Sequence, residues 1–173
     1  RGDEYRMTGR RLSGWAIDVG AHIGAWSIPT ALDNPGLQVI SVEAVPDNAD
    51  LLERNVTLNI TDGRVHVVRA AAAAPGTSET ICHYGYTSDP SANDGYLDAH
   101  RFVAGTWGAR GRPKFSVDTD SVSLDALLER FGIDEVAIIK IDCEGCEWAF
   151  LDTPAVSKVQ TVVGEYHGGI TGV

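Results

Sequence analysis

The stretch "GWAIDVGAHIGAWSIPTAL" (residues 14–32) decides the fold. Residues 14–20 form a short apolar run that ends in Asp18 and Gly20, and we expect a buried strand there. Residues 21–32 have the pattern of a helix, which "DNPG" ends. An acid followed by Gly20 and Gly24 is typical of a ligand-binding turn, because glycine lets a ligand approach the backbone and a helix N-terminus offers free N–H donors. The spacing G-x-x-x-G differs from the G-x-G-x-x-G of dinucleotide-binding folds.

A second acid, Glu43, lies near the end of the next predicted strand, residues 38–45. In a strand–helix–strand unit, an acid at the tip of the second strand holds ribose hydroxyls. Open α/β sheets bind their ligands at the carboxyl ends of parallel strands. Asp18, the two glycines and Glu43 therefore predict an adenosine-type cofactor that lies across these strand ends.

The rest of the chain continues the alternation of strands and helices. Helices are expected at 46–59, 123–132 and 147–159, and strands at 64–73, 136–142 and 161–167. Ser123 is placed to cap one helix, and Gly132 to end it. This order predicts one α/β domain over residues 1–173, with a mainly parallel sheet and helices on both faces. Between these elements, 80–86 has the pattern of a short strand, 87–114 that of a long loop and 114–123 that of an extended segment.

The composition limits the partners of the chain. Its 173 residues carry a net charge of −10, and its pI is about 4.8. A nucleic-acid binder normally shows a basic stripe, so we expect no nucleic acid partner. The sequence has no apolar run of about 18 residues, so we expect no membrane span. Three cysteines, two of them only three positions apart, make a poor disulfide framework and favour a cytoplasmic location.

Five segments together resemble a known family. Between about residues 16 and 167, they are similar to FkbM-type S-adenosylmethionine-dependent methyltransferases: "DVGAHIGAWS", "VEAVPDN", "VSLDALL", "IIKIDCEGCEWAFL" and "GEYH". The resemblance implies a Rossmann-like class I methyltransferase fold. It also implies methyl transfer from S-adenosyl-L-methionine, most often to a hydroxyl of a sugar or another natural-product scaffold. By the same resemblance, Asp18, Gly20 and Gly24 would line the methionine side of the cofactor, and Glu43 would hold the ribose.

The chain departs from the family pattern in two places. His22, in the same cofactor-binding turn, stands where the family more often has asparagine. A complete sheet of this class also has a further antiparallel pair of strands, and the sequence shows no segment for them after residue 167. We therefore expect contacts at His22 to differ and the last strands to be missing.

The segment "IIKIDCEGCEW" (138–148) places a lysine in an apolar strand. Neighbouring residues of a strand point to opposite faces, so Lys140 and Asp142 share one side. A buried lysine needs an acidic partner, for which the candidates are Glu144, Glu147 and Glu165. Asp142 is expected beside the sulfonium of the cofactor, where it would orient an acceptor or take its proton. The alternative is an ion-pair cluster that only pins the strand ends.

The last predicted strand ends in "GEYH", where Glu165 and His167 alternate onto one face. Both are expected near Asp142 if the two strands are neighbours. His167 would be a general base near neutral pH. The three residues could instead hold a divalent metal ion, as oxygen and imidazole ligands do. Whether a metal is used stays open at this point.

The segment "CEGC" is a C-x-x-C pair formed by Cys143 and Cys146. Such pairs can be redox-active or bind zinc. A zinc site needs two further ligands, and Cys82 and His167 are the candidates, although their spacing gives no support. We expect the pair to serve as small apolar fillers of the core.

The resemblance implies an O-methyltransferase that acts on a small-molecule acceptor, and the residues at the strand ends give Asp142, His167, Glu165 and Lys140 as catalytic candidates. The acceptor would enter from residues 84–121, and aromatic side chains there would form a lid or pack on the sheet: Tyr84, Tyr86, Tyr96, His100 and Trp107. The alternatives are an N-methyltransferase for a small amine, a nicotinamide-dependent oxidoreductase, which the missing glycine motif disfavours, and a cofactor-binding module without activity. The acceptor and the oligomeric state are left open.

Overall fold

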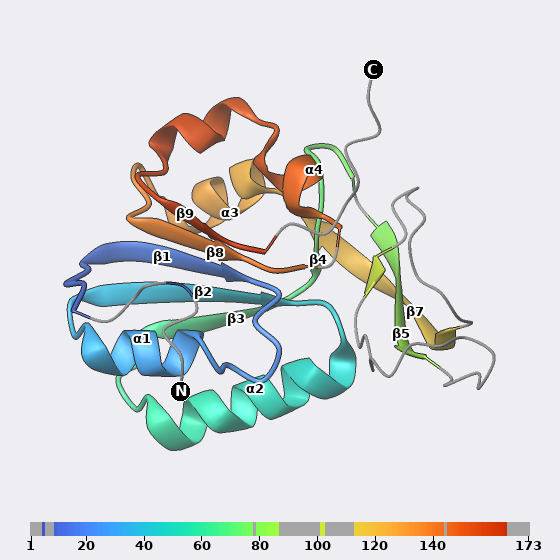
Figure 1. Ribbon diagram of the computed structural model, residues 1–173, viewed down its shortest axis with the longest axis horizontal. Coiled ribbons are helices and arrows are strands. Elements are labelled where there is room, and N and C mark those ends of the chain that lie inside the picture. Colours follow the sequence, from blue (N-terminus) through green and yellow to red (C-terminus); the bar gives the residue numbers. More distant parts are fainter. Residues whose placement is uncertain are drawn as a thin grey trace.

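The computed structural model describes residues 5, 9–77, 79–86, 101–102, 113–143 and 145–165 (Figure 1). Within these residues, the main sheet has five strands in the order β3-β2-β1-β8-β9. All neighbouring strands of this sheet run parallel. The strands are β1 (Gly14–Val19), β2 (Leu37–Glu43), β3 (Val65–Arg69), β8 (Ile138–Ile141) and β9 (Val162–Gly164). The predicted parallel sheet is confirmed.

Helices cover both faces of the main sheet (Figure 1). On one face lie α1 (Ser27–Asp33) and α2 (Pro46–Asn59), and on the other α3 (Leu124–Phe131), α4 (Glu147–Leu151) and the 3₁₀ helix η1 (Pro154–Lys158). Consecutive strand residues point to opposite faces, so Ala16 packs with α1 and α2 while Ile17 packs with α3 and α4. A sheet buried on both faces needs continuous apolar runs, which is the pattern that the strands show.

The strands of a second, smaller sheet lie between β3 and β8 in the chain. It consists of β4 (Ala71–Ala72), β5 (Glu79–Tyr86), β6 (Arg101–Phe102) and β7 (Pro113–Val122), in the order β4-β7-β5-β6. The expectation of one strand over 64–73 is therefore wrong, because β3 belongs to the main sheet and β4 to the smaller one. Figure 1 shows β5 and β7 beyond the carboxyl ends of the parallel strands. The smaller sheet thus lies toward the edge where the sequence places the cofactor.

The helix boundaries agree with the sequence in some places and differ in others. Helix α2 spans 46–59 as predicted, and the Ser123 hydroxyl caps α3 by accepting a hydrogen bond from the Ala126 N–H at 3.2 Å. The helix expected from residue 21 begins only at Ser27. The predicted helix over 147–159 is divided into α4 and η1, because Pro154 has no N–H to continue the ladder.

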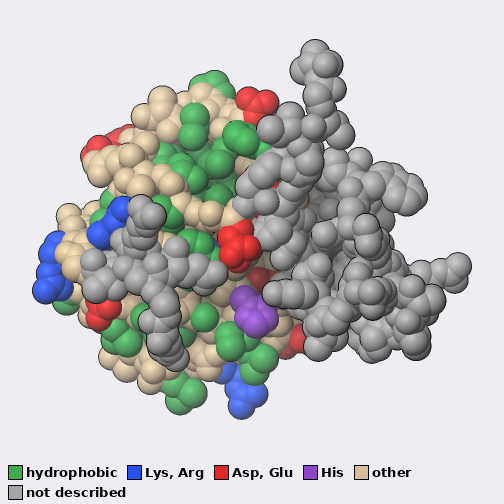
Figure 2. Space-filling model, in the orientation of Figure 1, with side chains coloured by type: hydrophobic (Ala, Val, Ile, Leu, Met, Phe, Trp, Pro, Cys, Tyr) green, Lys and Arg blue, Asp and Glu red, His purple; other side chains and the backbone are tan. Residues whose placement is uncertain are grey.

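In the part of the chain that the structure describes, no helix has the length and apolar character to cross a membrane. Figure 2 shows one face of the molecule, on which the Lys and Arg side chains of the described residues lie in separate places.

Candidate cofactor and active site

Three parallel strands end at one edge of the main sheet and bring distant residues together. Gly20 follows β1, Glu43 ends β2, and Asp142 follows β8. These three residues line one pocket, together with Val19, Val42, Ala44, Ala70, Ala72 and Cys143. The walls are thus mostly aliphatic, with two carboxylates at the polar end. This is the edge at which open α/β sheets bind ligands.

Glu43 is held rigidly in this pocket and is only 4% exposed. Its Oε2 accepts a hydrogen bond from the His22 N–H at 2.8 Å, and its Oε1 accepts one from the Val45 N–H at 2.9 Å. The Asn48 amide donates to Oε1 at 3.4 Å. Burial raises the pKa of Glu43, while the hydrogen bonds from Val45 and His22 oppose this rise. A carboxylate has about four acceptor positions, so one remains on Glu43 for a ligand hydroxyl.

The two glycines of the turn after β1 lie where a side chain would clash with neighbouring residues. Gly20 has a φ of 74°, and a Cβ at this position would lie 2.0 Å from the Asp142 carbonyl oxygen. A Cβ on Gly24, which has a φ of 89°, would lie 2.9 Å from the side chains of Ile28 and Leu52. Both glycines therefore permit close packing between neighbouring elements, and Gly20 also lines the pocket.

The expected free helix N-terminus is absent from this turn. Gly20 and Ala21 both donate their N–H groups to the Val42 carbonyl oxygen at 3.0 Å, and the His22 N–H is bound to Glu43. Helix α1 begins only at Ser27, because residues with positive φ at positions 20, 22 and 24 do not continue an α-helix. The turn therefore contributes shape and the anchoring of Glu43.

His22 adopts a left-handed conformation, with a φ of 52°, that asparagine and glycine enter more readily than other residues. We expect His22→Asn to change the free energy of unfolding by no more than about 0.5 kcal/mol. His22→Val should lower it by about 1–2 kcal/mol, because a β-branched side chain is strained there. Urea denaturation measures both. Equal stability of the two variants would show that the turn does not hold this conformation in solution.

Asp18 lies in the core and not on the pocket wall. It is 0% exposed, and its Oδ2 accepts a hydrogen bond from the Ser27 hydroxyl at 2.5 Å. The Ser27 and Ser41 hydroxyls are 2.7 Å apart, and Asp18 is paired in register with Ser41 on one side and Lys140 on the other. The expectation that Asp18 lines the methionine side is therefore corrected: its side chain supports the turn from beneath.

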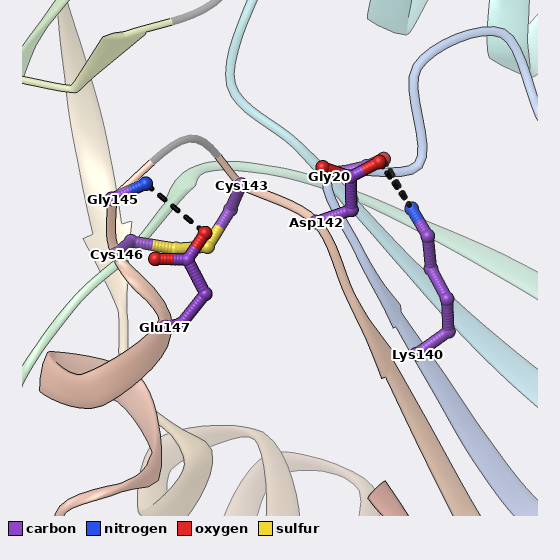
Figure 3. Close-up of a disulfide and its surroundings, with 7 residues drawn as sticks. All are labelled: Gly20, Lys140, Asp142, Cys143, Gly145, Cys146 and Glu147. Carbon is purple, nitrogen blue, oxygen red and sulfur yellow. Dashed lines mark hydrogen bonds and ion pairs between the residues drawn. A yellow bond between two sulfur atoms is a disulfide. The ribbon is translucent and has the colours of Figure 1, made fainter. Parts of the chain in front are cut away.

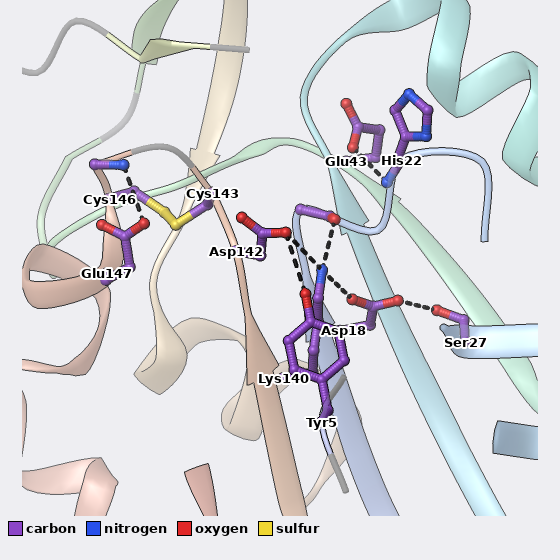
Figure 4. Close-up of polar contacts among 12 residues, drawn as sticks. Tyr5, Asp18, His22, Ser27, Glu43, Lys140, Asp142, Cys143, Cys146 and Glu147 are labelled. Atoms are coloured by element: carbon purple, nitrogen blue, oxygen red, sulfur yellow. Dashed lines mark hydrogen bonds and ion pairs between the residues drawn. A yellow bond between two sulfur atoms is a disulfide. The ribbon is translucent and has the colours of Figure 1, made fainter. Parts of the chain in front are cut away.

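Lys140 is the counter-ion of this buried acid, as Figure 4 shows. Its Nζ lies 3.2 Å from Asp18 Oδ1, donates to the Gly20 carbonyl oxygen at 3.0 Å, and lies 4.0 Å from Asp142 Oδ2. Three glutamates were expected as partners. Of these, Glu147 accepts a hydrogen bond from the Gly145 N–H at 3.1 Å, Glu165 follows β9, and residue 144 lies outside the described residues. Lys140 is 5% exposed, so these contacts make it a positioning residue.

Asp142 reaches the pocket from the end of β8, and its side chain is 29% exposed. The Tyr5 hydroxyl donates to Asp142 Oδ2 at 3.3 Å, and the Tyr5 ring lies 5.9 Å from Lys140 Nζ (Figure 4). Sequence reasoning missed Tyr5, because no local pattern links residues 137 positions apart. Tyr5 and Lys140 thus approach the same carboxylate and limit its orientation.

The residues expected next to Asp142 are placed only in part. The Glu165 N–H donates to the Ile141 carbonyl oxygen at 3.0 Å, so this residue follows β9 beside the end of β8. His167, the predicted general base, lies outside the described residues. Among the residues that are described, no group of three or more His, Cys, Asp and Glu could hold a metal ion.

The two cysteines of the C-x-x-C pair are joined. Cys143 and Cys146 form a disulfide, and both are buried in the core cluster that includes Phe150. The prediction of two separate apolar fillers is therefore wrong about the bond, although both residues pack in the core. The sequence signal for the bond was present in the spacing, but a three-residue separation alone does not distinguish a disulfide from a dithiol.

The strand order, the helices on both faces, and Glu43 and Asp142 at the carboxyl ends of β2 and β8 are those of a Rossmann-like class I methyltransferase fold. The model of the methyltransferase FkbM domain matches residues 18–172. Because this match covers most of the chain, the chain belongs to the FkbM methyltransferase family. The family model identifies the chain as a methyltransferase domain.

No curated protein matches the chain. Among solved structures, it is similar to a precorrin-6y C5,15-methyltransferase from Geobacter metallireducens GS-15, with 19% identity over 39% of this chain and 34% of that one, and a TM-score of 0.34. It is also similar to P. horikoshii TYW2 in complex with MeSAdo, with 26% identity over 40% of this chain and 26% of that one, and a TM-score of 0.36.

A third likeness covers more of the chain. The glycopeptide N-methyltransferase MtfA, solved with S-adenosyl-L-methionine, has 11% identity over 75% of this chain and 78% of that one, with a TM-score of 0.32. The matched parts span only 34% and 26% of the first two relatives. With such low scores, these likenesses support no conclusion about the acceptor.

Proposed function

We propose that this chain transfers a methyl group from S-adenosyl-L-methionine to a hydroxyl of a small acceptor, such as a sugar or another natural-product scaffold. The observation that carries the proposal is the meeting of Gly20, Glu43 and Asp142 around one pocket at the carboxyl edge of the sheet. Membership of the FkbM methyltransferase family supports the class of reaction. The choice of a hydroxyl rests on the resemblance and is the part that the experiment below tests.

The residues of the pocket fit this cofactor. Glu43 offers an anchored carboxylate with one acceptor position left for a ribose hydroxyl. The small side chains of Ala44, Ala70 and Ala72 leave aliphatic walls against which a flat adenine can lie. When bound, the cofactor supplies an electrophilic methyl carbon on a sulfonium. The protein then acts mainly by positioning the acceptor oxygen toward that carbon.

Asp142 is the described group best placed to handle the acceptor proton. Its carboxylate lines the pocket, and Tyr5 and Lys140 limit its orientation on the side away from solvent. It would accept a hydrogen bond from the acceptor hydroxyl and take the proton as the new oxygen–carbon bond forms. His167 remains an alternative proton acceptor that lies outside the described residues.

The affinity for S-adenosylhomocysteine should fall as the pH is lowered from about 8 to 5. Burial raises the pKa of Glu43, so this carboxylate takes up a proton at a higher pH than an ordinary glutamate. Protonation removes an acceptor for a ribose hydroxyl, so binding is complete above the raised pKa and is lost below it. Calorimetric titrations at several pH values measure the effect.

The pocket has two carboxylates, and the Asp142→Asn variant shows which of them causes the pH dependence. If Glu43 is the cause, this variant should keep the pH dependence of S-adenosylhomocysteine binding. Wild-type affinity that stays constant down to the ordinary pKa of glutamate would contradict the role of Glu43. Loss of the pH dependence in Asp142→Asn would assign it to Asp142 instead.

The activity is tested with isotope-labelled S-adenosyl-L-methionine and two panels of small acceptors, one with hydroxyls and one with amines. Labelled products that carry a methyl ether support the proposal, and Asp142→Asn should slow their formation without weakening S-adenosylhomocysteine binding. Products labelled only on nitrogen would identify an N-methyltransferase. Tight cofactor binding without transfer to either panel would favour a binding module without activity.

A further inference from the structure

The disulfide between Cys143 and Cys146 adjoins the cofactor pocket through Cys143, and Figure 3 shows the bond beside Asp142. Cys143 directly follows Asp142 and lines the pocket itself. Cys146 precedes α4, and its carbonyl oxygen accepts the first backbone hydrogen bond of that helix, from the Phe150 N–H at 3.0 Å. The bond therefore ties the pocket wall to the start of α4.

The segment that holds Cys143 is packed against the glycine turn without free space. An added Cβ on Gly20 would lie 2.0 Å from the Asp142 carbonyl oxygen and 3.3 Å from Cys143 Cα. The Asp142 N–H donates to the Val19 carbonyl oxygen at 3.0 Å. Because protein interiors are close-packed, a shift of Cys143 displaces the Gly20 turn or the Asp142 carboxylate. Both belong to the pocket.

A buried acid at the start of α4 contacts Gly145, which lies in the loop between the two cysteines. Glu147 is 4% exposed, and its Oε1 accepts the Gly145 N–H at 3.1 Å (Figure 3). Gly145 has a φ of 111°, a conformation that glycine enters and other residues avoid. Burial of a carboxylate is unfavourable, so opening of this loop gains hydration for Glu147. The disulfide opposes that opening.

We propose that Cys143–Cys146 is a reversible thiol–disulfide site that sets the affinity of the pocket for its adenosyl cofactor. The oxidised form holds Cys143, Asp142 and the Gly20 turn in the binding geometry. The reduced form lets the loop open and weakens binding. This inference rests on the proposed function, because it assumes that the pocket binds S-adenosyl-L-methionine.

The reaction partner is a dithiol, of the kind that dithiothreitol represents. One thiolate of the dithiol attacks a sulfur of the disulfide and forms a mixed disulfide, which the second thiol of the reductant then resolves. Two electrons and two protons pass to Cys143 and Cys146, which become thiols, and the reductant leaves as its own disulfide. The reverse reaction consumes an oxidised dithiol of the same class.

Cofactor binding and the reduction of the disulfide must affect each other by the same factor, which makes the proposal quantitative. If the disulfide form binds the cofactor tenfold more tightly, then bound cofactor disfavours reduction of the disulfide by the same factor of ten. For a two-electron couple, a tenfold change corresponds to about 30 mV in the reduction potential. Saturating S-adenosylhomocysteine should therefore make the potential of this pair more negative by about that amount.

The experiment uses the full chain with S-adenosylhomocysteine as the probe. Calorimetric titration compares the oxidised protein with protein reduced by dithiothreitol, and mass spectrometry after thiol alkylation reports the state of Cys143 and Cys146. The same alkylation in dithiothreitol redox buffers gives the reduction potential with and without the probe. Cys146→Ser, which cannot form the bond, should bind weakly with or without dithiothreitol, while Cys82→Ser should respond as the wild type does.

We expect at least about fivefold weaker binding after reduction, and the matching shift in potential. Equal affinity of the oxidised and reduced forms, with an unshifted potential, would overturn the inference and leave the proposed function intact. Resistance of the bond to reduction in the folded protein would also overturn it, because the site would then be purely structural. If neither form binds S-adenosylhomocysteine, the proposed function itself fails.

Discussion

Glu43→Ala is expected to weaken the binding of S-adenosylhomocysteine by about a hundredfold. A hydrogen bond to a charged group contributes up to about 3 kcal/mol, and a ribose hydroxyl would take the acceptor position that His22, Val45 and Asn48 leave on this carboxylate. A loss of about 3 kcal/mol corresponds to a little more than a hundredfold in the dissociation constant. Calorimetric titration with S-adenosylhomocysteine measures it, and NAD serves as the ligand that should not bind.

The structure provides a matched control for this variant. Glu53 lies on α2 and pairs with the exposed Arg69 at 2.7 Å, away from the pocket lining. Glu53→Ala should leave the affinity unchanged, since an exposed ion pair contributes about 0–1 kcal/mol to stability and nothing to the pocket. Urea denaturation of Glu43→Ala is needed as well, because the alanine leaves the Val45 and His22 N–H groups without their acceptor. A folded Glu43→Ala protein with nearly wild-type affinity would refute the role of Glu43.

Lys140→Met is expected to lower the free energy of unfolding by about 3–5 kcal/mol. Asp18 is 0% exposed, and Lys140 is the cation that lies 3.2 Å from it. Removal of one partner of a buried pair leaves an uncompensated charge, which is the costly case. Since a domain is stable by only about 5–15 kcal/mol, the melting temperature should fall by about 10 °C. Chemical and thermal denaturation measure both quantities.

A double-variant cycle shows whether the charge pair is the cause. Asp18→Asn together with Lys140→Met should be more stable than the sum of the two single changes predicts, because neither charge is then left alone. Lys158→Met is the control at an exposed position on η1, and it should stay within about 0.5 kcal/mol of the wild type. Additive effects, or a loss below about 1 kcal/mol for Lys140→Met, would mean that the pair does not stabilise the fold.

Features that depend on neighbouring residues could be predicted from the sequence. The strand over 14–19, the helix over 46–59 and the Ser123 cap follow from apolar periodicity, a proline start and a hydroxyl before a helix. The sequence placed Glu43 at the pocket, because an acid that ends the second strand of a strand–helix–strand unit lies at the carboxyl edge of the sheet. The resemblance to the family identified the class of methyltransferase.

Tertiary structure decided the features that depend on which strands and segments meet. Lys140 faces Asp18 because β8 lies beside β1, a strand order that no local pattern contains. Tyr5 approaches Asp142 for the same reason, although the two are 137 positions apart. The division of residues 64–73 between two sheets also required the position of β7, which pairs with β4.

The sequence by itself determined the type of most elements and the position of Glu43 at the pocket edge, because backbone propensity and burial pattern act over a few residues. It did not determine the partners of the buried charges or the disulfide that adjoins the pocket. Those depend on distances between chain segments, which exist only once the sheet has assembled. Asp18 illustrates the difference. Its position at the end of β1 was predicted, but only the structure shows that its side chain is buried and paired with Lys140 beneath the turn.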